Sequence, residues 1–409
     1  MNILILSNAP WSTSGYGTQA ALLARRLAAA GHRVGFSAQF GLHGAIRGWE
    51  GMPVYPADHT GFNKVMLPYH VDHFGQGEPV QVLTLIDLWV LTHPKYGDPA
   101  LFDGLNLASW MPVDHYPLPL TIIHALQHIK TRAIAMSRFG QETLAESGVN
   151  SMYVPHSIET SVYQPYPDSR DELRAAMGVP LDAFLIGMVA NNQGNSPVRK
   201  GFPQLLQAFA EFERTHPDSY LYLHTDLRGS LDGINLNTCA YAAGVPDEKI
   251  KAIDQAKYQM GLVPPEAMAR IYSLLDVLAM PSFGEGFGIP AIEAQACGVP
   301  VISTDWTAMP ELVGAGWKVQ GDRWYDQAHG SYFMCPSVYE ITEALEHAYE
   351  AREDQQLKER ARSFALQYDS DRVFTEHWQP TLDALSRPHE VGPLKPNRAA
   401  RRAKQKTAA

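Results

Sequence analysis

Residues 281–298 read PSFGEGFGIPAIEAQACG and follow a short apolar run that ends at Pro281. Pro290 suits the first turn of a helix, because its missing N–H and its fixed φ fit that position. The three glycines before it permit backbone angles that bring N–H groups close to a ligand. The stretch therefore predicts a strand, a glycine-rich loop and a helix whose N-terminus attracts anions.

Two glutamates accompany these glycines. Glu285 lies within the loop, and Glu293 lies in the first turn of the predicted helix. Ionised carboxylates accept hydrogen bonds, so two of them suit the vicinal hydroxyls of a sugar. The alternative is that Glu293 interacts only with the helix dipole and Glu285 only with solvent. The coincidence of two acids and three glycines in a strand–loop–helix context favours a binding site.

Short apolar runs alternate with helical periodicity along most of the chain, from Asn2–Leu6 to a helical stretch at 337–386. This alternation is typical of parallel sheets covered by helices. Residues 163–167 (YQPYP) separate two such series and suit a linker. We therefore predict two doubly wound α/β domains, with ligands bound at the carboxyl ends of the strands in a cleft between the domains.

Composition narrows the class of protein. The 409 residues include 33 Lys and Arg, 43 Asp and Glu, and three widely spaced cysteines. No apolar run approaches the roughly 18–20 residues that span a bilayer, and the N-terminal residues lack the pattern of a signal peptide. Scattered cysteines in an odd number indicate reduced thiols, so we expect a cytoplasmic protein.

The C-terminal residues 395–409 differ in charge from the rest of the chain. They contain six basic residues and no acidic one, which leaves 27 basic against 43 acidic residues, a net charge of −16, in residues 1–394. An acidic body of this kind disfavours nucleic acid, so no specific nucleic-acid recognition is expected. The basic tail is interpreted either as a solvated disordered segment or as a segment that contacts an anionic surface. In the second case the protein could associate peripherally with a membrane.

A second glycine loop follows the first predicted strand. Gly15 and Gly17, together with Ala20, match the spacing of a dinucleotide-binding fingerprint. Gly15 lies several residues beyond the strand, however, and no acidic residue stands near the end of the second strand to hold a ribose. The loop therefore suits either a phosphate or sugar hydroxyl at a helix N-terminus, or a simple capped turn.

Three further pairs are candidates for a site. Arg199 and Lys200 open an amphipathic helix. They offer the fixed cations that a diphosphate leaving group needs. The alternative is that they are only an exposed basic pair. Asp114 and His115 follow a predicted strand, either as ligand contacts or as a satisfied structural pair. The last pair is Asp87 and Trp89. They also lie at a strand end and are candidates for the acceptor side of the site.

These segments, in this order, resemble the retaining glycosyltransferases of the GT-B fold, family 4 (glycosyl transferases group 1). Glu285 and Glu293 are separated by seven residues and resemble the E-x7-E signature of that family. Gly15 and Gly17 resemble the family's N-terminal glycine loop, and residues 137–165 resemble its interdomain passage. Arg199 and Lys200 resemble the basic pair aimed at the donor diphosphate. Residues 310–313 (PELV) resemble the proline–glutamate step that follows the signature.

Two departures from the family pattern affect the site. Relatives often have an arginine directly after the strand that precedes the basic pair, where this chain has Asn191 and Asn192. Arg199 is therefore the expected substitute. Many relatives also have a His-Asp order where this chain has Asp114 and His115, so either residue of the pair is a candidate to contact the donor sugar.

The resemblance implies a division of the chain and a fold. The fold is α/β, GT-B, with two Rossmann-like domains facing each other across a cleft. The implied divisions are residues 1–165 as the acceptor-side domain, 166–368 as the nucleotide-sugar-binding domain, 369–394 as a C-terminal helix crossing back to the first domain, and 395–409 as the tail.

The resemblance also implies an activity: transfer of a hexose from a nucleotide diphosphate sugar to an acceptor hydroxyl, with retained anomeric configuration. The donor is a UDP or GDP sugar, and the acceptor a glycan, lipid, protein or small molecule. Neither a cofactor nor a metal is expected, because no Asp-x-Asp or His/Cys cluster appears where a metal-bound diphosphate would lie. The implied catalytic residues are Glu285, Lys200, Arg199, His115 and Asp114. The implied donor-binding residues are Gly15, Gly17, Arg199, Lys200, Glu285, Gly286, Phe287, Gly288 and Glu293.

Other functions are compatible with the same architecture. A nucleotide-sugar epimerase would convert its substrate without an acceptor, and a glycan phosphorylase would need phosphate or pyridoxal phosphate. A dehydrogenase would bind NAD, which the absent ribose acid argues against. A non-catalytic nucleotide-sugar-binding protein would bind the donor without turnover, although Lys200, Glu285 and Glu293 are all present.

Overall fold

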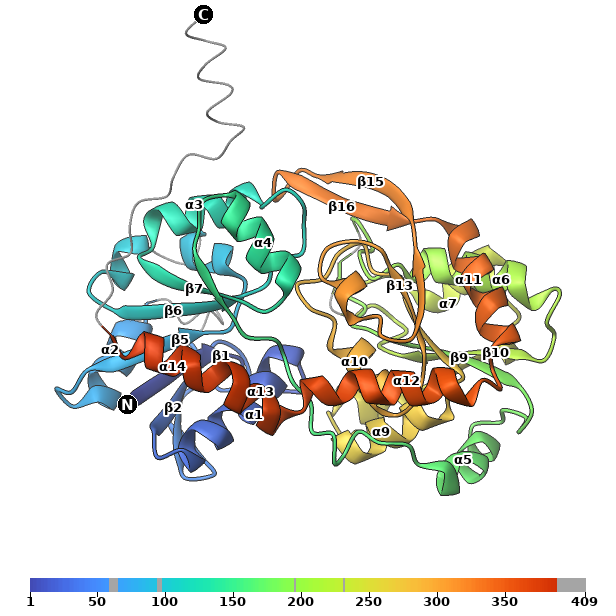
Figure 1. The fold of residues 1–409 in the computed structure, drawn as a ribbon, viewed down its shortest axis with the longest axis horizontal. Coiled ribbons are helices and arrows are strands. Elements are labelled where there is room, and N and C mark those ends of the chain that lie inside the picture. The colour runs from blue at the N-terminus through green and yellow to red at the C-terminus, as the bar shows by residue number, and fades with distance from the viewer. Residues whose placement is uncertain (59–64, 94–97, 195, 231, 388–409) are drawn as a thin grey trace, which may run out of the picture. The chain divides into compact units, whose positions relative to one another are not determined.

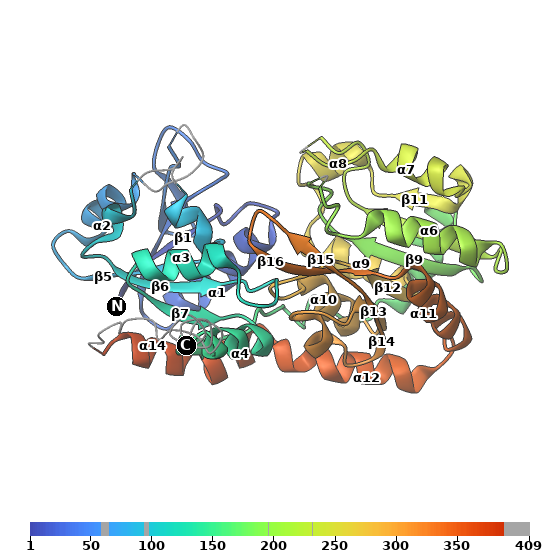
Figure 2. The same cartoon turned by 90° about the horizontal axis from the view of Figure 1, so that it is seen from above.

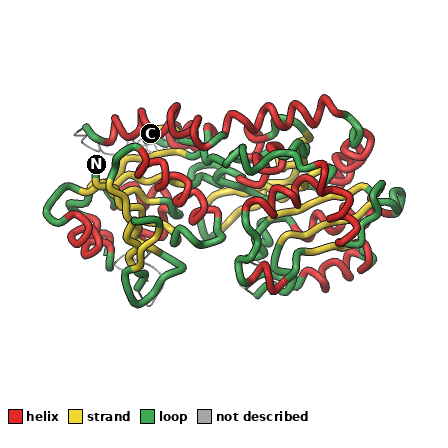
Figure 3. The backbone as a smooth tube through the Cα atoms, turned by 90° about the horizontal axis from the view of Figure 1, so that it is seen from below, coloured by secondary structure: helices red, strands yellow, loops and turns green. Residues whose placement is uncertain are grey.

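The computed structural model describes residues 1–409 except 59–64, 94–97, 195, 231 and 388–409. The predicted basic tail at 395–409 lies outside the described residues. The chain forms two compact units (Figure 1). Unit 1 consists of Met1–Ser157, Asp326–Ser331 and Ser370–Ala409, and unit 2 of Ile158–Tyr325 and Tyr332–Asp369. In each unit a layer of strands is flanked by helices (Figure 3).

The sheet of unit 1 has eight strands, and every neighbouring pair is parallel except β3 and β4. Their order across the sheet is β3 (Arg47–Trp49), β4 (Met52–Tyr55), β2 (Arg33–Ala38), β1 (Asn2–Ser7), β5 (Val80–Thr84), β6 (Asn106–Met111), β7 (Thr131–Ala135) and β8 (Ser151–Tyr153). The chain leaves β1 first toward β2 and later returns to its other side with β5. The point between β1 and β5 is therefore the switch point at which such sheets bind ligands.

Helices lie on both sides of this sheet, with α3 on one side and α4 and α14 on the other (Figure 2). The helical segments of unit 1 are α1 (Gly15–Ala29), α2 (Leu67–Gly75), η1 (Leu88–Thr92), η3 (Pro99–Phe102), α3 (Leu120–His128), α4 (Arg138–Glu146), α13 (Ser370–Val373), η8 (Phe374–Trp378) and α14 (Gln379–Leu385). The C-terminal helices pack on the sheet through Trp378, whose ring meets the edge of the buried Trp110 ring at 4.9 Å.

The main sheet of unit 2 has six parallel strands. Their order is β11 (Ile250–Ala252), β10 (Ser219–His224), β9 (Phe184–Val189), β12 (Val277–Met280), β13 (Val301–Thr304) and β14 (Gly316–Val319). Its switch point lies between β9 and β12. A separate two-stranded sheet is formed by β15 (Gly321–Asp326) and β16 (Ser331–Pro336), and the turn between these strands, Asp326–Ser331, belongs to unit 1.

The helices of unit 2 pack in two groups (Figure 1): α6 contacts α7 and α11, and α10 contacts α9 and α12. Their bounds are α5 (Arg170–Ala176), α6 (Phe202–Glu213), α7 (Leu236–Ala243), α8 (Gln255–Gln259), α9 (Pro265–Leu274), α10 (Ile289–Ala296), α11 (Val338–Glu350) and α12 (Gln355–Ala365), with short turns η4 (Pro167–Ser169), η5 (Asp247–Lys249), η6 (Met309–Leu312) and η7 (Leu366–Tyr368).

The amphipathic face of α6 is buried as its periodicity predicts. Phe202, Phe209 and Phe212 are each at most 1% exposed and pack in one cluster with side chains from the sheet and from α7 and α11. None of the helices in the described residues combines the length and the apolar character that crossing a membrane requires.

Candidate functional site

The loops that follow β9 and β12 lie side by side at the switch point of unit 2. The Phe283 amide donates a hydrogen bond to the Arg199 carbonyl oxygen at 2.7 Å. A Cβ at Gly201 would lie 2.0 Å from the Pro281 carbonyl oxygen, and the φ of this glycine is +75°. Only glycine fits there, because a side chain would both clash and strain the backbone. Gly201 thus lets the two predicted loops meet.

This contact brings the predicted basic pair to the predicted glutamate. The Lys200 Nζ lies 2.5 Å from one carboxylate oxygen of Glu285, and the Arg199 guanidinium lies 3.5 Å from the other. Arg199 also donates to the Gly284 carbonyl oxygen at 2.7 Å. The Glu285 side chain is 14% exposed. Arg199 and Lys200, whose side chains are 36% and 19% exposed, are therefore part of a charged cluster with Glu285.

The charges in this cluster decide the protonation of Glu285. Burial alone raises the pKa of its carboxyl, but the positive charges of Lys200 and Arg199 outweigh burial and hold the pKa below its usual value. Glu285 is consequently ionised at neutral pH. Its carboxylate keeps two cations in fixed positions at the carboxyl edge of the sheet.

The backbone of the glycine-rich loop is fixed by its neighbours. The Glu285 amide donates to the Thr307 hydroxyl at 3.1 Å, and Thr307 is buried with a φ of +55°. Gly288, the residue before α10, has a φ of +126°, which favours glycine. Phe287 is 3% exposed and packs on the ring of Tyr368, so its side chain serves the core. Any ligand contact of Phe287 and Gly286 would then involve backbone groups.

Glu293 lies on α10 and has partners within unit 2. The Tyr272 hydroxyl donates to its carboxylate at 2.8 Å, and Tyr163 donates a second hydrogen bond. Burial raises the pKa of Glu293, and these two hydrogen bonds offset the effect only in part. Glu285 and Glu293, with seven residues between them, therefore lie in opposite electrostatic surroundings.

The departure at Asn191 and Asn192 has a structural explanation. Asn192 is 1% exposed, and its amide nitrogen donates to the carbonyl oxygens of Asp226 and Ile234 at 2.8 and 2.7 Å. Its side-chain oxygen accepts from the Ile234 amide at 3.1 Å. Asn192 thus holds the segment that follows β10, and the basic groups after β9 come from Arg199 and Lys200.

In unit 1 the predicted glycine loop forms a capped turn. Ser14 precedes α1, and its hydroxyl oxygen accepts from the Gly17 amide at 3.1 Å and from the Asn8 side chain at 2.7 Å. A Cβ at Gly17 would lie 2.6 Å from the Ser12 carbonyl oxygen. Gly17 therefore serves a close approach of helix and loop, and Gly15 is the first residue of α1.

The loops after β1 and β5 meet beside this turn. The Ser7 hydroxyl donates to the Leu85 carbonyl oxygen at 3.0 Å. Asp87 precedes the short helix η1, and the half-buried ring of Trp89 within η1 lies edge-on to the ring of His329 at 5.8 Å. The candidate acceptor residues Asp87 and Trp89 thus stand at the carboxyl edge of the sheet, at its switch point.

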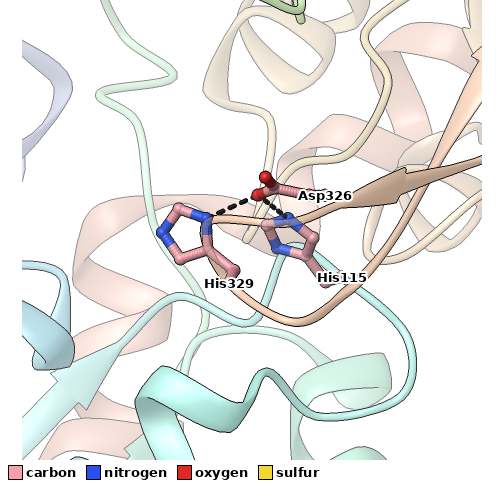
Figure 4. A group of neighbouring side chains, drawn as sticks. All are labelled: His115, Asp326 and His329. Atoms are coloured by element: carbon pink, nitrogen blue, oxygen red, sulfur yellow. Dashed lines mark hydrogen bonds and ion pairs between the residues drawn. The ribbon is translucent and has the colours of Figure 1, made fainter.

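The Asp114–His115 pair is linked to the turn between β15 and β16 (Figure 4). His115 is 1% exposed, with its Nδ1 2.7 Å from Asp114 and its Nε2 3.1 Å from Oδ2 of Asp326. The Nδ1 of His329 lies 2.5 Å from the same Oδ2. Burial alone raises the pKa of Asp326, but the hydrogen bonds from His329, from the Ala328 amide and from His115 outweigh it and lower the pKa below its usual value.

Sequence comparison bears on unit 2. Residues 185–350 match the protein family described as Glycosyl transferases group 1. This segment is a glycosyl transferases group 1 domain. The chain is also 28% identical over 173 residues to the D-inositol 3-phosphate glycosyltransferase of Corynebacterium jeikeium, a match that covers 40% of this chain and 37% of that relative. The chain thus spans well under half the length of this relative.

Solved structures extend the likeness to the whole fold. The sucrose-phosphate synthase of Thermosynechococcus elongatus superposes with a TM-score of 0.70 at 16% identity, over 94% of this chain and 99% of that one. The Anabaena protein HepE in complex with UDP-glucose superposes with a TM-score of 0.62 at 17% identity, over 94% and 100%. At such identities the likeness concerns the fold alone. The predicted GT-B fold with two α/β domains is confirmed.

The glycosyl transferases group 1 domain contains the predicted residues Arg199, Lys200, Glu285 and Glu293, and also Thr307, which sequence reasoning missed. Asp326 and His329 were also missed. They follow His115 by more than 200 positions, in a turn whose sequence (DQAHGS, 326–331) matches no ligand spacing. Only the fold brings them together.

Proposed function

We propose that the protein is a retaining glycosyltransferase that transfers a sugar from a nucleotide diphosphate sugar to an acceptor hydroxyl. One observation carries this proposal: Lys200 and Arg199 are held against Glu285 at the switch point of a glycosyl transferases group 1 domain. A sheet of this kind binds ligands at its switch point. Two fixed cations there suit the charge that develops on a departing nucleoside diphosphate.

The proposed roles follow from the chemistry of each group. Lys200 and Arg199 neutralise the diphosphate, and the N-terminus of α10, with the backbone of Gly286 and Gly288, adds a partial positive charge. Glu285 holds both cations in place before the donor arrives and contacts the donor sugar or its phosphate. In this scheme the cations need no reorganisation during the reaction.

Glu293 is proposed to bind the ribose hydroxyls. Its carboxylate already accepts hydrogen bonds from Tyr272 and Tyr163, which orient it. A carboxylate has about four lone-pair sites, so two tyrosine hydroxyls leave acceptor capacity for a ribose.

In unit 1 we propose that the acceptor binds near Asp87 and Trp89, and that Gly15 and Gly17 take part through the α1 N-terminus. Of the Asp114–His115 pair, Asp114 is the better candidate for a sugar contact. Its side chain is 24% exposed, whereas that of His115 is 2% exposed and engaged at both nitrogens.

We propose that UDP sugars are the donors to test first, because HepE, a structural neighbour, binds UDP-glucose. We further propose that Arg199 and Lys200 replace a divalent metal at the diphosphate, so transfer needs no added Mg²⁺ or Mn²⁺. The acceptor class remains a glycan, a lipid, a protein or a small molecule.

The decisive experiment measures donor binding and turnover separately. Thermal unfolding of the full chain is followed with UDP, GDP and their hexose conjugates, because a ligand at 100 times its Kd stabilises by about 2.7 kcal/mol. The proposal predicts stabilisation by one nucleoside diphosphate and loss of it in Lys200→Ala. Turnover of the matching nucleotide sugar that requires an acceptor supports transfer; conversion without an acceptor indicates an epimerase instead. Binding unaffected by Lys200→Ala contradicts the site assignment.

A further inference from the structure

Three side chains from two segments far apart in sequence converge within unit 1 (Figure 4). His115 follows β6, Asp326 ends β15, and His329 lies in the turn before β16. One nitrogen of each histidine and one carboxylate oxygen of Asp326 all lie within 4.8 Å of one another. His115 and Asp326 are buried, and the His329 side chain is 28% exposed.

The protons available to His115 do not satisfy both of its contacts. Its Nδ1 faces Asp114 and its Nε2 faces Asp326, and both partners are carboxylates. A neutral imidazole carries only one N–H, so its other nitrogen presents a lone pair. That lone pair would face the lone pairs of a carboxylate oxygen. A metal ion placed there would be bound by both groups at once.

The spacing of the three ligand atoms fits a metal. Zn–N and Zn–O bonds of about 2.0–2.2 Å place neighbouring ligand atoms about 3.3 Å apart in a tetrahedral shell. The Asp326 Oδ2 lies 3.1 Å from the His115 Nε2 and 2.5 Å from the His329 Nδ1. A shift of about 0.8 Å at the partly exposed His329 would bring its contact with Asp326 to this spacing.

The surroundings hold each ligand in the orientation that binding needs. In the tautomer whose Nδ1 donates to Asp114, the Nε2 of His115 carries the lone pair that a metal needs, which is the carboxylate–histidine arrangement found beside zinc. The Ala328 amide donates to Oδ1 of Asp326 at 3.0 Å, which leaves Oδ2 for the histidines. The Leu120 amide donates to the His329 carbonyl oxygen at 3.0 Å and fixes the turn.

We propose that His115 Nε2, Asp326 Oδ2 and His329 Nδ1 bind a Zn²⁺ ion, with Asp114 as the hydrogen-bond partner that positions His115. Two imidazoles and a carboxylate match the donor preference of zinc, whereas Mg²⁺ and Ca²⁺ prefer oxygen ligands throughout. Three protein ligands leave a fourth position for solvent. All three proposed ligands belong to unit 1.

The test is zinc binding by the full chain. The purified protein is stripped of metal with a chelator and titrated with Zn²⁺ in competition with a chromophoric zinc indicator. We expect one ion per chain, with affinity lowered at least 100-fold in His329→Ala and in Asp326→Ala. Asp114→Asn keeps the three ligands and is expected to lower affinity by roughly 10–100-fold.

The chain offers a matched control on α3. His124 and His128 are exposed, lie four residues apart with ring centroids 4.1 Å apart, and are the kind of pair that binds zinc adventitiously. The double variant His124→Ala, His128→Ala is expected to bind zinc as the unaltered chain does. X-ray absorption of the zinc-loaded protein should show two imidazole ligands, and one fewer in His329→Ala.

Three outcomes would overturn the proposal: no stoichiometric zinc binding, binding unchanged in a folded His329→Ala variant, or binding lost only in the α3 double variant. The circular dichroism spectrum of each variant shows whether it is folded. Because His329 is partly exposed, its replacement should leave the fold intact. None of these readouts depends on glycosyl transfer, so failure here leaves the proposed function standing.

Discussion

At the scale of single residues, the contact between Lys200 and Glu285 makes a direct prediction. Lys200→Ala removes the cation nearest to Glu285 and leaves Arg199 as its remaining partner. If both cations stabilise the leaving diphosphate, kcat/KM for transfer should fall by roughly 100-fold or more, the usual cost of removing one preorganised donor. The measurement is initial-rate kinetics with the nucleotide sugar identified by thermal unfolding.

A matched control lies in the same unit. Lys249 pairs with Glu213 at 3.4 Å, and its side-chain exposure of 12% is close to the 19% of Lys200. Lys249→Ala should leave kcat/KM within twofold of the unaltered enzyme. Equal losses in the two variants would mean that Lys200 acts through stability and not through the donor.

Glu293 makes a second prediction, which concerns pH. Its pKa is raised in the folded state above the ordinary value of 4.5, so the folded chain binds more protons than the unfolded chain between those two values. Stability therefore falls as pH rises through the range above 4.5. In Glu293→Gln this fall should be smaller. Urea unfolding from pH 4 to pH 8 measures the difference; a steeper fall in the variant would contradict the assignment.

The residues that sequence reasoning found share a property. Glu285 lies in a loop directly after an apolar strand, and Arg199 and Lys200 lie just before the start of an amphipathic helix, so local patterns indicated both positions. Thr307 was missed because its partner Glu285 lies 22 positions away. Asp326 and His329 were missed because Asp326 bonds to His115, 211 positions away, and a contact across the fold leaves no spacing to recognise. Phe287 was predicted to bind the donor because it lies in the glycine-rich loop, and the local pattern did not show that its side chain is buried in the core.

At the scale of elements, the start of α1 depends on Gly17. A Cβ there would lie 2.6 Å from the Ser12 carbonyl oxygen, a backbone atom that cannot move without shifting the loop. Gly17→Ala should therefore lower the free energy of unfolding by about 1–3 kcal/mol through overpacking. Gly48→Ala is the control, because nothing lies within 4 Å of its Cβ position. Urea denaturation compares them, and equal midpoints would refute this account of the loop.

Strand positions were largely predictable and helix starts less so. The apolar run at Asn2–Leu6 became β1 and the run at Val301–Thr304 became β13, because parallel strands buried on both faces require continuous apolar residues. Helix α1 begins at Gly15, despite the poor helix propensity of glycine, because Ser14 caps it. Short strands such as β11 carry too few residues to show periodicity.

At the scale of the whole molecule, the order of elements was the strongest signal. Alternating strands and helices predicted two doubly wound sheets, and both sheets have switch points, between β1 and β5 and between β9 and β12. The hairpin of β15 and β16 was not foreseen, because residues 321–336 alternate weakly and carry many polar residues. Its turn nevertheless supplies Asp326 and His329, two of the three proposed zinc ligands.

Because each unit has its own core, we expect a bound ligand to slow amide hydrogen exchange in the segments that it contacts. Amide hydrogen exchange with saturating nucleoside diphosphate should slow in residues 199–201 and 281–298, which form the charged cluster and its loop, because a bound ligand lowers the population of open states. The β10–β11 edge of the same sheet serves as an internal reference. Two results would place the nucleotide elsewhere. One is that exchange slows as much in Lys200→Ala as in the unaltered chain, and the other is that exchange slows only at the reference edge. Slowing at residues 14–17 as well would support the additional role proposed for Gly15 and Gly17.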